Sequence, residues 1–341
     1  QLFKAETPGP MKDTKLTPRI AETARGLWVV YFAIAITCFF AYRAAGMGYA
    51  DAFMHMCSTM GLGGFSSYDA SFGQFNSPAI EAVAIVFMLI AGINFALYFV
   101  AWKRRSVWGV VRDFEARLFL LTMAAAVLGI AVFLTVHKVY PTFTESLRHA
   151  AFNVVSIATT TGFASVDYAQ WPAFAPVLML FLCCFATCAG STGGGIKMIR
   201  ALILLKQARR EITRILHPRA MNPVFLGRQV IENNVIFAVL ALILLKGARR
   251  ELKRIVHPRA VVPVTLGGAA VDANVLQSVL AFMLIYGAVM VGATMLLLFS
   301  GLDVVSAFTA VIASINNTGP GLGQVGPAAN YQGLSDFQTW V

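Results

Sequence analysis

Five long apolar segments constrain this chain more than any other feature of its sequence. They are residues Gly26–Gly46, Pro78–Trp102, Leu118–Val136, Pro172–Ala189 and Val275–Gly301. A helix that crosses a bilayer needs about 20 mainly apolar residues, and a soluble chain of 341 residues could not bury five such helices. Charged residues make up only 13% of the chain, about half of what soluble domains carry. The sequence therefore predicts an all-α, multi-pass integral membrane protein in contact with lipid.

The basic residues predict the orientation of these helices. If Gly26–Gly46 runs outward, the inside segments are 1–25, 102–117 and 197–274, which hold 24 of the 27 Lys and Arg residues. Short loops rich in Lys and Arg stay in the cytoplasm. The net charge of +11 is thus explained by topology, and we expect no nucleic-acid partner.

A short pattern follows each of the three outward helices. It spans Tyr49–Phe65, Thr144–Phe163 and Asp303–Pro320. Each copy begins with an amphipathic stretch too short to cross a bilayer and ends in a Gly- and Thr-rich run. The copies align on Gly64, Gly162 and Gly319. Ordinary turns between helices could explain one such pattern but explain three equivalent copies poorly. We expect repeated helix–pore-loop–helix units, as in potassium channels, around a central pore.

The chemistry of this unit suits an alkali cation. Backbone that is not helical is tolerated at membrane depth only where it lines a cavity or is buried in protein. A loop that exposes successive carbonyl groups can replace the hydration shell of such a cation. The predicted filter residues are Gly61, Leu62, Gly63, Gly64, Thr159, Thr160, Thr161, Gly162, Asn316, Asn317, Thr318 and Gly319, none of which is acidic. These residues do not decide between potassium and sodium, or between a symporter and a gated channel.

Several strings of this sequence resemble one family of membrane proteins. They are Ala158–Phe163, Cys188–Lys197 and Asn316–Gly323, supported by Pro8–Asp13 and His217–Ala220. Together they are similar to the TrkH-type bacterial potassium transporter subunits of the Trk/Ktr/HKT superfamily. The resemblance implies potassium uptake across the bacterial inner membrane through four units around one pore. It also implies a homodimer, a cytosolic TrkA-like ring that binds nucleotide, no enzymatic activity, no metal other than potassium and no organic cofactor.

A Gly-rich loop interrupts the inward helix of the middle unit. It consists of Gly190, Ser191, Thr192, Gly193, Gly194 and Gly195, followed by Lys197. A phosphate-binding loop is a poor match because Ile196 separates the glycines from the lysine. A simple helix break is possible, since glycine readily breaks helices. We favour a flexible gate beneath the filter, the role that the resemblance implies.

The organisation of this chain differs from that of the family at its two ends and in a 40-residue internal repeat. The chain begins after the family's first unit and stops at Val341, before the last inward helix, so the predicted pore is incomplete. The predicted parts are a cytoplasmic lead-in (1–25), a second unit (26–102), a cytoplasmic loop (103–117), a third unit (118–200), a basic cytoplasmic segment (201–274) and part of the last unit (275–341). Residues 201–240 recur as 241–280, and 18 of the first 24 positions match. We favour a chimeric insertion over a genuine duplication, because the spacing from Gly162 to Gly319 is 157 residues and removing 40 brings it near the 98 residues from Gly64 to Gly162.

Other candidate residues and functions remain open at this stage. Asp69, Asp167 and Asp303 lie on the predicted outer side, either concentrating cations or serving as solvated or capping residues. Asn94 is expected inside a helix, bonded to a neighbouring helix. A non-conducting scaffold and an intramembrane hydrolase using Ser191 are the alternative functions, and neither explains the repeats.

Overall fold

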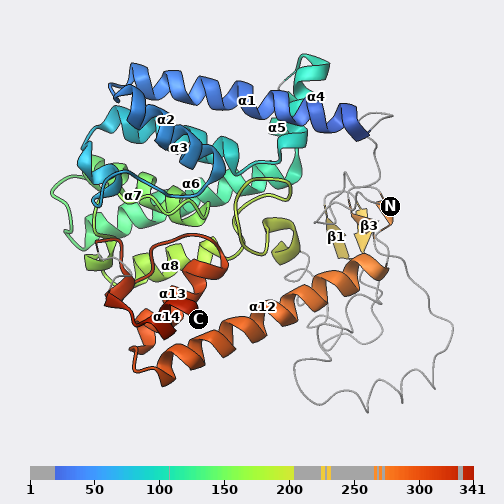
Figure 1. Cartoon of the computed structure of the whole chain (residues 1–341). Coiled ribbons are helices and arrows are strands. Elements are labelled where there is room, and N and C mark those ends of the chain that lie inside the picture. The colour runs from blue at the N-terminus through green and yellow to red at the C-terminus, as the bar shows by residue number, and fades with distance from the viewer. Residues whose placement is uncertain are drawn as a thin grey trace, which may run out of the picture. The chain divides into compact units, whose positions relative to one another are not determined.

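The computed structural model describes residues 20–106, 108–202, 224–226, 229–231, 265–266, 269–270, 273–328 and 333–341. The chain divides into two compact units. The smaller comprises Gln1–Lys15 and Ile199–Ala288, and the larger comprises Leu16–Met198 and Val289–Val341. All three predicted filter loops and the Gly-rich loop lie in the larger unit, which is predominantly helical (Figure 1).

The larger unit begins with two helices joined by a tight turn, followed by a bent helix pair. These elements are α1 (Ile20–Ala44), α2 (Tyr49–Gly61), the short 3-10 helix η1 (Ser71–Gln74), α3 (Pro78–Ala91), α4 (Phe95–Arg104) and α5 (Trp108–Arg112). Pro78 occupies the first turn of α3, where its missing N–H costs nothing. The helix α2 packs against α1 and α3, so the outward helix, the short helix and the inward helix form one packed group.

The same order recurs further along the chain. The elements are α6 (Phe114–Val136), α7 (Phe143–Ala158), η2 (Tyr168–Gln170) and α8 (Phe174–Cys183), then α12 (Ala273–Phe299), α13 (Val304–Ile315), η3 (Gly323–Val325) and α14 (Asp336–Trp340). Side chains cap several helix starts: Asp113 accepts from the N–H of Ala116, and Thr142 accepts from that of Glu145. Figure 1 shows α6 and α7 side by side, in agreement with their contacts.

Two of the five predicted membrane spans are wrong as continuous helices. Three helices in the described part of the chain are long and apolar enough to cross a bilayer, with windows at Ala24–Ala44, Phe114–Val136 and Phe282–Phe299. The predicted span Pro78–Trp102 is instead α3 and α4, bent by 88° at a short break. The predicted span Pro172–Ala189 contains only α8, which ends at Cys183.

Four short strands were not predicted from the sequence. In the smaller unit, β1 (Val224–Leu226) pairs with β2 (Gln229–Ile231), and β3 (Thr265–Leu266) pairs with β4 (Ala269–Ala270), both antiparallel. The pairs Leu226–Gln229 and Leu266–Ala269 are related by the same 40-residue offset as the sequence repeat. Equivalent positions of the two copies thus form the same hairpin. Most of the predicted basic segment 201–274 lies outside the described residues.

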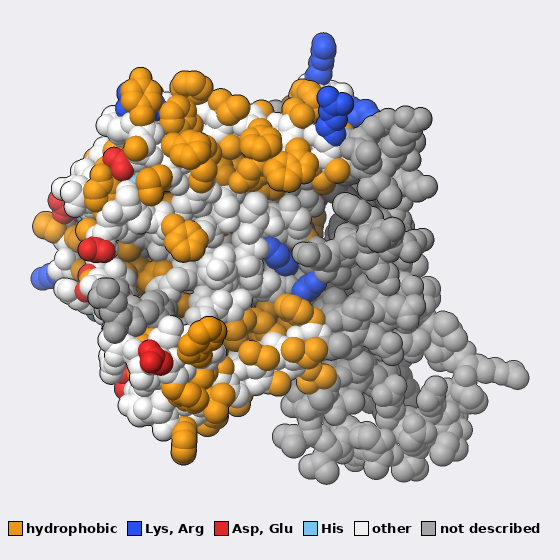
Figure 2. All heavy atoms as spheres, in the orientation of Figure 1, with side chains coloured by type: hydrophobic (Ala, Val, Ile, Leu, Met, Phe, Trp, Pro, Cys, Tyr) orange, Lys and Arg blue, Asp and Glu red, His pale blue; other side chains and the backbone are white. Residues whose placement is uncertain are grey.

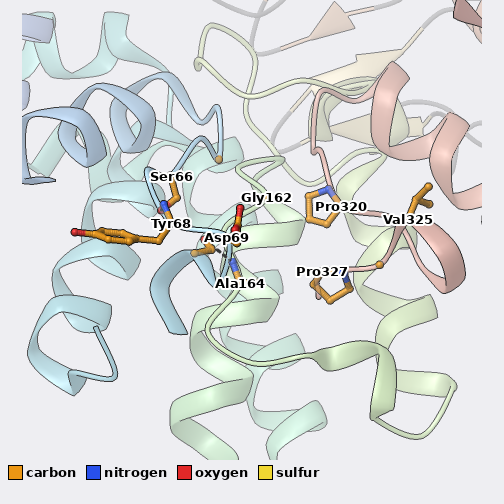
Figure 3. A pocket seen from close by; sticks show the side chains of 11 residues that line it. Ser66, Tyr68, Asp69, Gly162, Ala164, Pro320, Val325 and Pro327 are labelled. Carbon is orange, nitrogen blue, oxygen red and sulfur yellow. Dashed lines mark hydrogen bonds between the residues drawn. The ribbon is translucent and has the colours of Figure 1, made fainter. Parts of the chain in front are cut away.

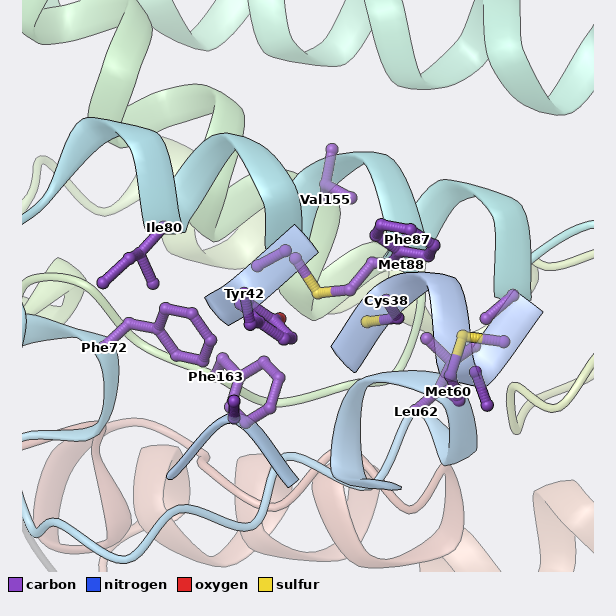
Figure 4. Packing of buried hydrophobic residues seen from close by; sticks show 14 of the residues in the cluster. Cys38, Tyr42, Met60, Leu62, Phe72, Ile80, Phe87, Met88, Val155 and Phe163 are labelled. Carbon is purple, nitrogen blue, oxygen red and sulfur yellow. The ribbon is translucent and has the colours of Figure 1, made fainter. Parts of the chain in front are cut away.

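The helices of the larger unit pack around separate apolar clusters. One cluster joins α1, α2 and α3 to α7 through residues such as Cys38, Tyr42, Met88 and Phe152, all fully buried (Figure 4). A second cluster joins α6, α7 and α8 to Ile312 of α13. In lipid such contacts stabilise by close van der Waals packing, because the surroundings are as apolar as the core. The repeated units are therefore packed directly against one another.

Apolar side chains also cover the outside of the described helices. Trp28, Phe32 and Phe40 on α1 and Phe299 on α12 are exposed, and Figure 2 shows hydrophobic side chains along both helices. An exposed apolar band on long helices is expected where the surrounding solvent is hydrocarbon. This supports the predicted membrane environment.

One ion pair links two repeated units near the predicted outer side. The guanidinium of Arg148 on α7 donates to both carboxylate oxygens of Glu81 on α3, at 2.8 and 2.7 Å. The Glu81 side chain is 4% exposed and that of Arg148 is 28% exposed. Removing one partner of a buried pair leaves an uncompensated charge. The pair therefore fixes the position of α7 relative to α3.

We expect Glu81→Gln to lower the free energy of unfolding by about 2 kcal/mol, somewhat less than for a fully buried pair because Arg148 is partly hydrated. The measurement is thermal unfolding of the complete protein in detergent. Glu145→Gln, an exposed acid on the same helix α7, is the matched control and should change the midpoint little. Equal midpoints for both variants would contradict this role for the pair.

Candidate functional site

The three short helices end in the same backbone motif. The N–H groups of Gly63, Thr161 and Thr318 each donate to a carbonyl five residues back, at 2.9, 2.8 and 2.7 Å. The residue before each of them donates to a carbonyl three residues back. These two bonds define the Schellman motif, which closes a helix with a left-handed residue. Residues 61–64, 159–162 and 316–319, the repeat loops, thus leave their helices in the same way.

The backbone dihedral angles of the repeat loops follow one pattern. Positive φ occurs at Leu62, Thr160 and Asn317, and again two residues later at Gly64, Gly162 and Gly319. Left-handed backbone is unfavourable for leucine and for β-branched threonine. Its recurrence at equivalent positions with unrelated side chains indicates that the backbone conformation itself is required. Alternating handedness turns successive carbonyl groups to the same side, which an ion-binding loop needs.

The repeat loops pack on one another in succession. A Cβ atom at Gly64 would overlap the carbonyl oxygen of Thr161, and one at Gly162 would overlap that of Thr318. In both cases the glycine of one loop meets the residue just before the glycine of the next loop. This repeated contact between successive loops is expected of equivalent segments arranged around a common axis. Only glycine allows backbones to approach this closely.

Polar side chains of the short helices form hydrogen bonds with the residues that follow each repeat loop. His55 contacts the hydroxyl of Ser66 at 3.0 Å, Asn153 exchanges hydrogen bonds with Ser165, and the N–H of Leu322 donates to Thr309 at 2.9 Å. Asn153 and Thr309 were missed in the sequence analysis. Their signal was a polar residue on the buried face of each short helix. These residues position the repeat loops without belonging to them.

A cavity of about 240 Å³ adjoins the repeat loops on the side away from the Gly-rich loop. Gly64 and Gly162 line it together with Asp69, Pro320 and Pro327, and Figure 3 labels Asp69 and Gly162 in the middle of the view. The other two acidic candidates are helix caps. Asp167 accepts from the N–H of Ala169 and Asp303 from that of Ser306, and the Ser306 hydrogen bonds lower the pKa of Asp303.

The Gly-rich loop, residues 190–195, lies against the last turn of α2 and the first residues of the second and third repeat loops. The hydroxyl of Thr192 donates to the carbonyl of Met60 in the last turn of α2, at 3.0 Å. A Cβ at Gly193 would lie 3.0 Å from the carbonyl oxygen of Thr159, and one at Gly194 would overlap that of Asn316. The N–H of Gly194 donates to Thr160 at 2.7 Å. The loop therefore covers the carbonyl ends of all three short helices.

The side chain of Lys197, two residues after the Gly-rich loop, folds back onto it. Its ammonium group donates to the carbonyl of Gly193 and lies 3.4 Å from the hydroxyl of Ser191 and 3.5 Å from that of Thr187. Ser191 donates its own proton to the carbonyl of Cys188 at 2.7 Å. The lysine thus ties the loop together. The serine is engaged in the same network and is not arranged as the nucleophile that a hydrolase needs.

The helix break between α3 and α4, residues Gly92–Asn94, supports the Gly-rich loop. The N–H of Cys188 donates to the carbonyl of Gly92, and the N–H of Phe95 donates to the carbonyl of Gly190, both at 3.1 Å. Asn94 was expected to bond a neighbouring helix, but its side chain caps α4 by accepting from the N–H of Ala96. The two helix breaks thus supply hydrogen-bond partners for each other's unpaired backbone groups. Such groups need partners at membrane depth, where water is absent.

The predicted site residues fall into two packed sets. The repeat-loop residues lie together, except that Gly61 is still the last residue of α2 rather than part of the extended loop. The Gly-rich loop is longer than predicted, because non-helical backbone already begins at Cys184 and reaches Lys197. Every predicted residue of both sets lies in the described part of the larger unit.

This chain resembles one family of known proteins along nearly its whole length. The family model described as "TrkH: Cation transport protein" matches residues 1–338. The chain belongs to the TrkH family. This family is one of transport proteins and not of enzymes, as the sequence analysis predicted.

Individual TrkH relatives match over the whole chain. The Trk system potassium uptake protein TrkH of Vibrio parahaemolyticus is 40% identical over 346 residues, which cover all of this chain and 62% of the relative. The TrkH protein of Escherichia coli K12 is 38% identical over 341 residues, with the same coverage. The crystal structure of the potassium transporter TrkH from Vibrio parahaemolyticus superposes with a TM-score of 0.74 and 38% identity, over 95% of this chain and 61% of that chain. The chain thus spans about 62% of the length of the curated relatives it matches.

Proposed function

We propose that this TrkH-family chain takes up potassium ions through a carbonyl-lined filter at the repeat loops. The observation that carries the proposal is the equivalent backbone of the three loops, which are closed by the same motif, with the first loop stacked on the second and the second on the third. A short helix points its carbonyl-rich end toward its loop, which favours a cation. The filter residues are those of the repeat loops, with Gly61 contributing from the end of α2.

The Gly-rich loop is proposed as the gate of this pathway. Its residues Thr192–Gly195 contact the inner ends of the repeat loops, so ions that leave the filter meet this loop first. The basic segments face the cytoplasm and the cavity faces outside, in the bacterial inner membrane. The relatives named above are parts of a "Trk system", which supports a regulatory partner such as a TrkA-like ring. A homodimer is proposed on the same family grounds.

The test is rubidium and potassium uptake into proteoliposomes that contain the complete protein. Uptake that potassium inhibits and sodium inhibits less supports the proposal. Robust uptake without preference among alkali cations would contradict a carbonyl filter. Absence of uptake even with the cytosolic partner added would favour a scaffold without conduction.

We expect Asp69 to raise the local potassium concentration at the outer cavity, which it lines. A carboxylate beside a concave entrance attracts cations. Because Asp69 is exposed, removing one charge should raise the KM for uptake only about two- to five-fold in low salt, with the maximal rate unchanged. The measurement compares Asp69→Asn with Glu145→Gln, which removes an acid outside the cavity. Equal KM values for both variants would exclude this role.

A further inference from the structure

The break at Gly92–Asn94, here named the elbow, connects the Gly-rich loop to a helix that leads away from it. Besides the bonds of Cys188 and Phe95, the hydroxyl of Thr192 approaches the carbonyl of Ala91 at 3.4 Å. The side-chain oxygen of Asn94 lies 2.6 Å from where a Cβ at Gly190 would be. The loop therefore cannot move away from the filter ends without breaking contacts with the first turn of α4.

The helix α4 is rigidly attached to the elbow. The hydroxyl of Tyr98 donates to the carbonyl of Ile90 at 2.9 Å, across the break. Phe95, Leu97 and Phe99 are buried, and the rings of Phe95 and Tyr31 of α1 are 5.6 Å apart. Because α4 is fixed on both sides, a displacement of its far end is transmitted to the elbow.

The direction and composition of α4 suit a membrane surface. Since α3 is bent by 88° from α4, α4 lies in the plane of the bilayer if α3 runs along the bilayer normal. Its far end and the following residues expose five basic side chains: Lys103, Arg104, Arg105, Arg112 and Arg117. Trp102 and Trp108 are 61% and 66% exposed, and Arg112 lies over the ring of Trp108 at 5.5 Å. Figure 2 shows Lys and Arg side chains gathered near the end of α4, beside hydrophobic ones.

The acidic residues of this segment are engaged elsewhere. Asp113 caps α6, and the carboxylate of Glu115 accepts from the N–H of Ala189 at 2.8 Å, beside the Gly-rich loop. The carboxylate of Asp113 is thus held at the start of α6, and that of Glu115 is held beside the Gly-rich loop. Exposed tryptophan next to Lys and Arg is typical of helices that lie at the headgroup level of a bilayer.

We propose that the surface formed by Trp102–Arg105, Trp108 and Arg112 binds anionic phospholipid headgroups, and that this binding sets the position of the gate through the elbow. The proposal rests on the function proposed above. Anionic headgroups hold α4 in the plane of the inner leaflet, which keeps the first turn of α4 docked on the Gly-rich loop. Each basic residue near an anionic surface strengthens binding by about five-fold.

The experiment uses the complete protein in liposomes of phosphatidylcholine with or without phosphatidylglycerol. Rubidium uptake is measured for the wild type, for the triple variant Lys103→Gln/Arg104→Gln/Arg105→Gln, and for the charge-retaining control Lys103→Arg/Arg104→Lys/Arg105→Lys. We expect uptake by the wild type and the control to change at least about three-fold with phosphatidylglycerol, since three charges act together. The triple Gln variant should lose this dependence.

A second readout does not depend on transport. Brominated lipids quench tryptophan fluorescence, and the difference between the wild type and Trp102→Phe reports lipid at α4. Stronger quenching by brominated phosphatidylglycerol than by brominated phosphatidylcholine, lost in the triple Gln variant, supports the proposal. Equal quenching by the two lipids overturns it.

The outcomes separate this inference from the proposed function. Uptake that depends on phosphatidylglycerol equally in the wild type and the triple Gln variant overturns the inference but leaves potassium transport intact. Loss of activation by a cytosolic partner, with lipid dependence retained, assigns the surface to a protein and also overturns it. Absence of uptake in every lipid contradicts the proposed function, whereas the quenching experiment still decides whether the surface binds anionic lipid.

Discussion

Replacing Gly162 by alanine is expected to abolish most selective uptake while the protein still folds. A Cβ at this position would overlap the carbonyl oxygen of Thr318, and the residue has a φ of +90°. The added methyl group must push the repeat loop of the last unit away, so at least one carbonyl group leaves its place. A loss of about 1.4 to 2.8 kcal/mol in cation binding corresponds to about ten- to hundred-fold lower affinity.

The control separates the effect of backbone conformation from that of the clash. Gly46, in the turn between α1 and α2, has a φ of +105°, but a Cβ there would meet no atom of the described residues within 4 Å. Gly46→Ala thus has a comparable conformational cost, about 1–2 kcal/mol, without moving a filter loop. Potassium and sodium competition with rubidium uptake is measured for both variants. Unchanged selectivity and affinity in Gly162→Ala would place the ion pathway elsewhere.

Replacing Gly194 by alanine is expected to have the opposite effect on flux. In the described structure a Cβ on Gly194 would overlap the carbonyl oxygen of Asn316, so the Gly-rich loop could not stay against the filter ends. Overpacking of this kind costs about 1–3 kcal/mol. A bias of that size against the closed loop raises the ratio of open to closed states by about 5- to 150-fold.

Uptake in proteoliposomes without a cytosolic partner should therefore rise, with the preference for potassium over sodium unchanged because the repeat loops keep their own contacts. Gly129→Ala on α6 is the matched control, since a Cβ there would meet no described atom within 4 Å. Lower uptake in Gly194→Ala than in this control would show that the loop must be close to the filter for conduction. A change in ion preference would show that the loop belongs to the filter itself.

The sequence predicted most of the repeated framework. Apolar length gave α1, α6 and α12 to within a few residues, because crossing a bilayer requires a long apolar helix whatever the tertiary context. The alignment on Gly64, Gly162 and Gly319 gave three loops whose backbones are equivalent in the structure. Local chemistry fixes such features: a short amphipathic helix cannot cross the membrane, and glycine is needed where backbones touch.

The break between α3 and α4 and the early end of α8 at Cys183 were decided by tertiary structure. Gly92, Ile93 and Asn94 are compatible with an apolar helix, so no hydropathy window indicated the 88° bend. Cys184 to Ala189 likewise continue the apolar character of α8. These segments leave the helix because their freed backbone groups bond one another, as Cys188 does with Gly92 and Phe95 with Gly190. The sequence by itself determined where the long apolar helices and the three repeated loops lie, whereas only the packing of distant segments decided the break at Gly92–Asn94 and the end of α8, since the compensating partners lie about 95 residues apart along the chain.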